Sequence, residues 1–184
     1  MSSLDLVGVE DGGFKAFQPG QSTFLCAVSM VGNSIESIEL SRITVDGRDA
    51  TEVLLGMLDT IRCDAVILGG VSFAGFNIMD PMRLYKELGV PVIIYSGERP
   101  DSASVLAALK VHFADWEVRW ASIARLGDIY SLITKVGYKP VFFEVVGESR
   151  DWCEKVLRSS ASLTRAPEPI RVARILARGL TKTV

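Results

Sequence analysis

Two acidic residues, Glu10 and Asp11, directly follow an apolar run near the N-terminus. The run from Leu4 to Val9, with glycines after the acids, predicts a buried strand that ends in a tight turn. Such a strand would carry two carboxylates at its C-terminal end. Carboxylate oxygens are ligands that Mg²⁺ and Mn²⁺ prefer, and paired ions stabilise the attacking and leaving oxygens of phosphodiester hydrolysis. Metal-assisted hydrolysis is therefore the first chemistry that the sequence indicates.

Asp46 offers a second acidic position, because it ends a predicted strand just before a predicted helix. We therefore take Glu10, Asp11 and Asp46 as the candidate catalytic and metal-binding residues, with Mg²⁺ or Mn²⁺ as the expected ion. Structural roles compete with this interpretation. Asp46 also suits a turn with Gly47, and Asp49 is expected to act as the N-cap of the helix.

A glycine-flanked segment, residues 69–80, follows a predicted central strand, where ligands enter open α/β sheets. Its glycines would let the backbone approach a phosphate, and its two phenylalanines could stack on a base or simply cover the core. The candidate substrate-binding positions in this segment are Gly69, Gly70, Phe73, Gly75, Phe76 and Asn77. Asp80 could add a metal ligand, although Asp80-Pro81 is also a helix-start signal.

The C-terminal segment is basic, and its cations recur at spacings of three and four residues along a predicted helix. The members of this stripe are Arg171, Arg174, Arg178 and Lys182. We assign Arg171 and Arg174 to substrate binding, because a line of cations can contact the phosphates of nucleic acid. A solvated helix face explains the same pattern.

The predicted elements run β-β-β-α-β-α-β and then continue with further helices and strands. The runs 24–31 and 35–45, joined by Gly32-Asn33-Ser34, predict a hairpin, and residues 49–62 predict the first helix. Alternating strands and helices in the middle of the chain indicate parallel pairing. This order is typical of the ribonuclease-H-like fold, with a mixed five-stranded sheet and helices on both faces. At 184 residues the chain suits a single domain, residues 1–184.

Composition restricts the partners and the compartment. The net charge of −2 creates no global field for nucleic acid, so DNA binding would depend on a local patch. Three scattered cysteines favour neither disulfides nor a zinc site, and the longest apolar stretches are too short to span a bilayer. We expect a cytoplasmic protein without a membrane partner.

Five ordered segments together resemble the archaeal endonuclease dU family, which is in turn similar to endonuclease V. These segments are Val7–Gly12, Ile43–Thr51, Ala74–Asp80, Asp115–Arg119 and Pro167–Arg171. The resemblance implies a ribonuclease-H-like, endonuclease-V-like domain that uses Mg²⁺ and acts on DNA with deaminated bases such as deoxyuridine.

The resemblance also assigns site residues by position. The endonuclease V aspartate at the end of the first strand falls on Glu10, and the glutamate before the first helix falls on Asp46. The third acid, at the end of the fourth strand, falls on Gly69, which supplies no ligand.

Three hypotheses follow. The first is a metal-dependent endonuclease of DNA repair. The second is a nucleic-acid-binding protein of the same fold with weakened or no catalysis, which Gly69 favours. The third is a small-molecule enzyme or regulator that uses the glycine-rich loop.

Overall fold

A seven-stranded sheet forms the centre of the computed structural model, which describes residues 4–15 and 20–181. In this described part the strands are β1 (Asp5–Asp11), β2 (Ser22–Val31), β3 (Ser34–Thr44), β4 (Ala65–Leu68), β5 (Ser72–Phe73), β6 (Asn77–Ile78), β7 (Val92–Ser96), β8 (Tyr130–Leu132) and β9 (Val141–Val146). The helices are α1 (Ala50–Leu58), α2 (Pro81–Leu88), α3 (Ser102–His112), α4 (Trp116–Ala124), α5 (Arg150–Ser160) and α6 (Glu168–Thr181).

The strand order is β3-β2-β1-β4-β7-β9-β8. Strands β1, β4 and β7 are parallel, whereas β2, β3, β8 and β9 join the sheet by antiparallel pairing. The predicted mixed α/β class and the predicted hairpin of β2 and β3 are confirmed. The sheet is wider than the predicted five strands because β9 and β8 extend it beyond β7.

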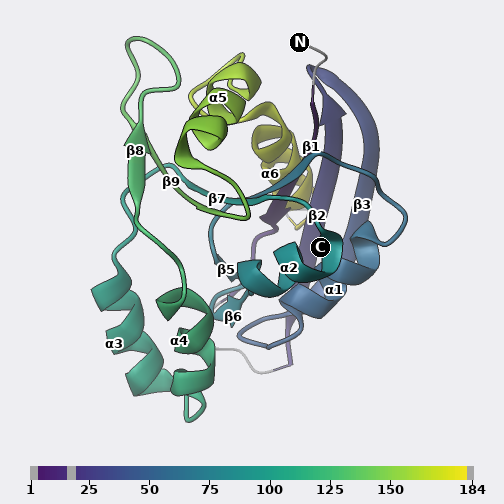
Figure 1. Cartoon of the computed structure of the whole chain (residues 1–184). Coiled ribbons are helices and arrows are strands. Elements are labelled where there is room, and N and C mark those ends of the chain that lie inside the picture. The colour runs from purple at the N-terminus through teal and green to yellow at the C-terminus, as the bar shows by residue number, and fades with distance from the viewer. Residues whose placement is uncertain (1–3, 16–19, 182–184) are drawn as a thin grey trace.

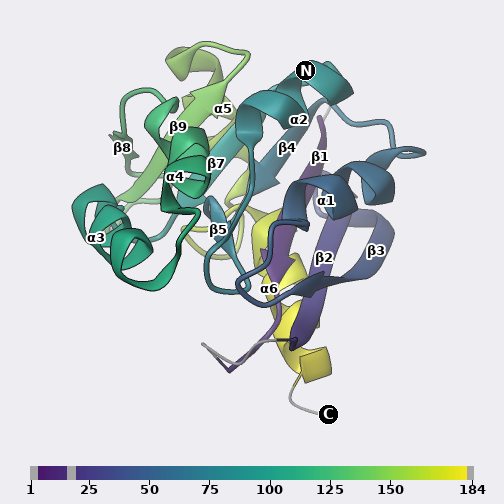
Figure 2. The same cartoon turned by 90° about the horizontal axis from the view of Figure 1, so that it is seen from below.

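Helices cover both faces of the sheet (Figures 1 and 2). Helices α1 and α2 pack on the face that carries Val9 and Leu68, and α5 and α6 cover the opposite face. Strands β1 and β4 are buried on both sides, which explains their continuous apolar runs. Helices α3 and α4 lie side by side at one end of the sheet (Figure 1).

The sequence signals for helix ends predict α2 correctly but fail at the start of α1. Asp80 accepts a hydrogen bond from the amide of Arg83, and Gly89 ends α2 in a left-handed conformation. At α1 the predicted capping by the Asp49 side chain is wrong, because its carboxylate instead accepts hydrogen bonds from Thr44 and Asn77. Helix α1 also ends at Leu58, before the predicted position near residue 62.

Close contact between β1 and α6 places the C-terminal helix beside the acidic end of the first strand. A Cβ atom at Gly8 would overlap the backbone of Pro169 and Ile170, so glycine lets the helix approach β1 directly. About one turn further along α6, Arg174 reaches the end of β1. In residues 4–15 and 20–181, no helix has the length and apolar character needed to cross a membrane.

Candidate nuclease site

Glu10 is buried at the end of β1 on the α6 face, with 4% of its surface exposed. Its Oε1 accepts a hydrogen bond from Nε of Arg174 at 3.0 Å and a second from Nη2 of the same residue. A Cβ atom at position 69 would overlap this carboxylate, so Gly69 makes room for the longer acid. Burial raises the pKa of Glu10 to about 7, although the Arg174 charge opposes the rise.

Asp11 points to the opposite face of the sheet, as alternation along a strand requires. Its Oδ2 accepts a hydrogen bond from the backbone amide of Ala74 at 2.5 Å. Burial raises the pKa of Asp11, and the Ala74 amide partly offsets this rise. The two neighbouring acids therefore lie in different surroundings. Glu10 lies beside α6, and Asp11 lies beside the loop after β4.

Asp46 meets the same loop from the turn that follows β3. Its Oδ1 accepts from the amide of Phe76 at 2.9 Å, and its own amide donates to the carbonyl of Ala74 at 2.8 Å. A Cβ atom at Gly75 would overlap the Asp46 carboxylate, so this approach requires glycine. The residues from Ala74 to Phe76 therefore join the carboxylates of Asp11 and Asp46.

Backbone strain is concentrated at this junction. Among the described residues, Asp46 and Ala74 are the non-glycine positions with positive φ, at 56° and 44°. Such conformations cost on the order of 1–3 kcal/mol each and occur preferentially at functional sites. Both strained residues therefore lie where the turn after β3 contacts the loop after β4.

Arg119 on α4 links the turn after β3 to the loop after β4, a role that the sequence pattern did not predict. It is buried, and its Nη1 donates to the carbonyls of Gly47 and Phe76, each at 2.7 Å. Asp115 accepts from Nε of Arg119 at 2.9 Å and holds the guanidinium in place. The only signal was that Asp115–Arg119 belongs to one of the five family-like segments.

The predicted substrate-binding loop contains several side chains that the fold itself uses. Asn77 is fully buried and bonds to the amide of Ala50, the carbonyl of Thr44 and the carboxylate of Asp49. Phe73 lies in the core, and Phe76 packs edge-on against Phe113 at 5.4 Å. Of the predicted glycines in this loop, Gly69 lies against the Glu10 carboxylate and Gly75 against that of Asp46, whereas a Cβ atom at Gly70 would meet nothing within 4 Å.

The acids do not form a ready-made metal site. The described residues contain no group of three or more acidic, histidine or cysteine side chains that could hold a metal ion. One oxygen each of Glu10, Asp11 and Asp46 already accepts hydrogen bonds from protein. Asp80 caps α2 and pairs with Arg125 at 2.7 Å, so it serves a structural role.

The described cations of the basic stripe differ in their contacts: some pair with acids of the fold, and another is exposed. Arg171 pairs with the buried Glu168 at 2.7 Å and helps to fix the start of α6. Arg174 is half-buried against Glu10, whereas Arg178 is exposed and near enough to both acids to oppose the rise in their pKa values. Lys182 lies outside the described residues.

The buried Glu10 predicts a pH dependence of stability. Folded Glu10 keeps its proton up to about pH 7, whereas the unfolded chain releases it near the ordinary value of 4.5. Its stabilising contribution is therefore present below the unfolded value and is lost as the pH rises through 7. Urea unfolding at about pH 5 and pH 8 should show lower stability at the higher pH, and a smaller decrease in Glu10→Gln. Equal decreases in Glu10→Gln and the exposed control Glu36→Gln would contradict this assignment.

Comparisons with known proteins connect this geometry to a family. The chain matches the family described as Endonuclease dU over residues 2–181. It is 38% identical over 154 residues to a UPF0215 protein of Methanosarcina mazei, covering 82% of this chain and 78% of the relative.

Solved structures show the same fold. A protein of unknown function from Archaeoglobus fulgidus superposes with a TM-score of 0.84 at 23% identity, covering 96% of this chain and 97% of that one. Endonuclease V of Ciona intestinalis, solved with DNA containing an inosine, has a TM-score of 0.64 at 13% identity. That match covers 98% of this chain and 87% of the Ciona chain, and it confirms the ribonuclease-H-like fold.

Proposed function

The chain belongs to the endonuclease dU family, and from this premise we propose that it is a DNA-repair endonuclease that cuts DNA near deaminated bases such as deoxyuridine. The observation that carries the proposal is the junction at residues 74–76, where Asp11 and Asp46 meet on strained backbone. The junction lies beyond the C-terminal ends of β1 and β4, the edge where open α/β sheets bind ligands.

The chain's own groups suit phosphodiester hydrolysis. A carboxyl group whose pKa is about 7, as for Glu10, can accept a proton from water near neutral pH and return it. Arg174 would exchange its bond with Glu10 for a substrate phosphate, which frees the carboxylate when substrate arrives. We assign proton transfer to Glu10 and phosphate binding to Arg174 and Arg178.

We propose dependence on Mg²⁺ or Mn²⁺ because the endonuclease dU family and the endonuclease-V-like fold suggest it. The acids are not arranged as a complete site, so we assign no step to the ion. The test is to incubate the protein with labelled DNA carrying uracil, hypoxanthine or no lesion, with either ion or with EDTA. Ion-dependent cleavage beside the lesion is the expected result.

A second candidate is a nucleic-acid-binding protein that does not cut. The separation of Glu10 from Asp11 and Asp46 by the sheet favours it. Lesion-selective binding without cleavage under either ion would support this candidate and reject the nuclease.

The exposed Arg178 provides a test of the DNA-binding face. Removing one cation that contacts a phosphate lowers the slope of log affinity against log salt by about 1. We expect this change for Arg178→Ala in DNA-binding titrations between low and moderate salt. Lys86→Ala, on α2 and without a contact to the acidic edge, should keep the wild-type slope. An unchanged slope for Arg178→Ala would place the DNA elsewhere.

A further inference from the structure

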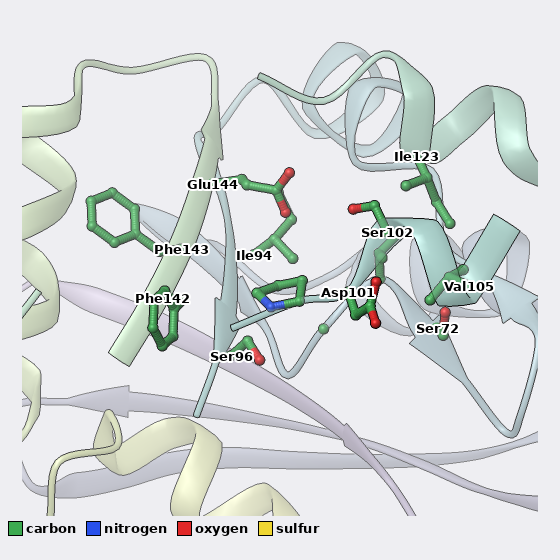
Figure 3. Close-up of a pocket in the computed structure, with 13 residues that line it drawn as sticks. Ser72, Ile94, Ser96, Asp101, Ser102, Val105, Ile123, Phe142, Phe143 and Glu144 are labelled. Atoms are coloured by element: carbon green, nitrogen blue, oxygen red, sulfur yellow. The ribbon is translucent and has the colours of Figure 1, made fainter. Parts of the chain in front are cut away.

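A cavity of about 200 Å³ opens beside the loop that follows β4. Gly70 and Ser72 of that loop form one side, and β7, β9, α3 and α4 form the others through residues such as Ile94, Val105 and Ile123. Figure 3 shows these side chains around the space, with Phe143 pointing to the other side of its strand. The cavity therefore begins at Gly70, just after the C-terminal end of β4, on the sheet face opposite the Glu10 carboxylate.

Glu144 on β9 is the polar feature of this cavity that the fold does not explain. It is 9% exposed, and its carboxyl group extends from the strand into the cavity (Figure 3). No described residue donates a hydrogen bond to it or pairs with it, unlike Glu10. Burial raises the pKa of Glu144 to about 7. Among the described residues no fully buried side-chain oxygen lacks a hydrogen-bond partner, so the Glu144 oxygens are accessible from the cavity and can accept from a donor that enters it.

The sheet register places Glu144 on the same face as the junction of Asp11 and Asp46. Glu144 pairs with Ile94, Ile94 with Leu68, and Leu68 with Val9. Side chains in this row point to one face, and Asp11 follows Val9 by two residues on that face. With strands about 4.8 Å apart, three steps put β9 about 14 Å from β1. A nucleotide chain that crosses the acidic edge can therefore place a base in the cavity.

The size and walls of the cavity suit one heterocycle. Its volume of about 200 Å³ is below the range of about 300–1,000 Å³ that is usual for drug-sized ligands. Val105 and Ile123 offer apolar surface of the kind that holds an extruded base, and a polar group at the end can bond to the edge of that base.

We propose that this cavity receives the deaminated base and that Glu144 accepts a hydrogen bond from its ring N–H. The proposal rests on the nuclease function and specifies what that site recognises. Deamination converts a ring nitrogen that accepts hydrogen bonds in cytosine or adenine into an N–H donor in uracil or hypoxanthine. An acceptor at Glu144 is therefore matched to the group that deamination creates. Both bases share this chemistry, and separate arms of the experiment distinguish them.

The test measures equilibrium binding in EDTA, where no cutting occurs, by fluorescence anisotropy of labelled single-stranded oligonucleotides. The strands differ at one base, which is uracil, hypoxanthine, cytosine or 3-methyluracil. The wild-type protein should prefer uracil to cytosine and lose this preference with 3-methyluracil, which lacks the ring N–H. Glu144→Ala should weaken uracil binding at least about tenfold without weakening binding of 3-methyluracil, because the donor loses its acceptor.

Two controls separate recognition from folding. Glu144→Gln keeps an acceptor oxygen and should bind uracil within about threefold of wild type. Glu36→Ala removes the same charge from the exposed edge strand β3 and should behave as wild type. Thermal melting of each variant shows whether it is folded.

Any one of three results would overturn the proposal. The first is equal wild-type binding of uracil and cytosine, and the second is equal binding of uracil and 3-methyluracil. The third is a folded Glu144→Ala variant that keeps the uracil preference. Base-selective binding without cleavage would reject the nuclease and keep this pocket. Cleavage with a preference that ignores Glu144 would reject the pocket and keep the nuclease.

Discussion

Changing Asp46 to asparagine is expected to lower the rate of DNA cleavage by about 100-fold or more, as for loss of a positioned catalytic group. The asparagine oxygen can still accept the hydrogen bond from Phe76, so the junction should survive while the negative charge is lost. Single-turnover cleavage of uracil-containing DNA measures the effect, and the melting temperature reports the fold.

Asp59→Asn is the matched control for this prediction. Asp59 is an exposed acid at the end of α1, away from the junction. Its variant should cleave at the wild-type rate. If Asp46→Asn also keeps the wild-type rate, Asp46 is only a turn residue and the junction is not the nuclease site.

Introducing an aspartate at Gly69, where the endonuclease V pattern has its third acid, should damage the protein and not activate it. Its Cβ atom would overlap the Glu10 carboxylate, and a second negative charge would lie beside a buried acid. Overpacking of this kind costs about 1–3 kcal/mol. We expect a lower melting temperature and a large loss of cleavage in Gly69→Asp.

Shortening the neighbouring acid should reverse part of this damage. In the Glu10→Asp/Gly69→Asp double variant the carboxylate at position 10 withdraws from the space over residue 69, so the melting temperature should recover. Gly127→Asp is the control, because a Cβ atom there meets nothing within 4 Å. A fully stable, active Gly69→Asp single variant would show that Glu10 does not need this glycine.

Local signals predicted most of the fold correctly. The Asp80-Pro81 start of α2 and the turn between β2 and β3 depend on capping and turn chemistry within short windows. The end of α1 was misplaced because no glycine marks it. The full width of the sheet was missed because the pairing of β9 with β7 joins residues that are far apart in sequence.

The candidate site was less accessible to sequence reasoning. The prediction placed Glu10 and Asp11 in one metal site, whereas alternation along β1 points them to opposite faces, and no sequence pattern showed that Arg174 would bond to Glu10. The role of Arg119 depends on carbonyl groups of Gly47 and Phe76, which no sequence pattern reveals. Glu144 stood within an apolar strand as one acid, and only the surrounding cavity distinguishes it from an exposed residue.

The most direct test compares the wild-type protein with Glu10→Ala/Asp11→Ala on DNA that carries one uracil, in Mg²⁺ or Mn²⁺. We expect the wild type to cut near the uracil and leave undamaged DNA intact, and the folded double variant to cut neither. Cleavage that persists in the double variant, or a wild type that cuts no DNA, would contradict the assignment of the acidic end of β1 as a nuclease centre.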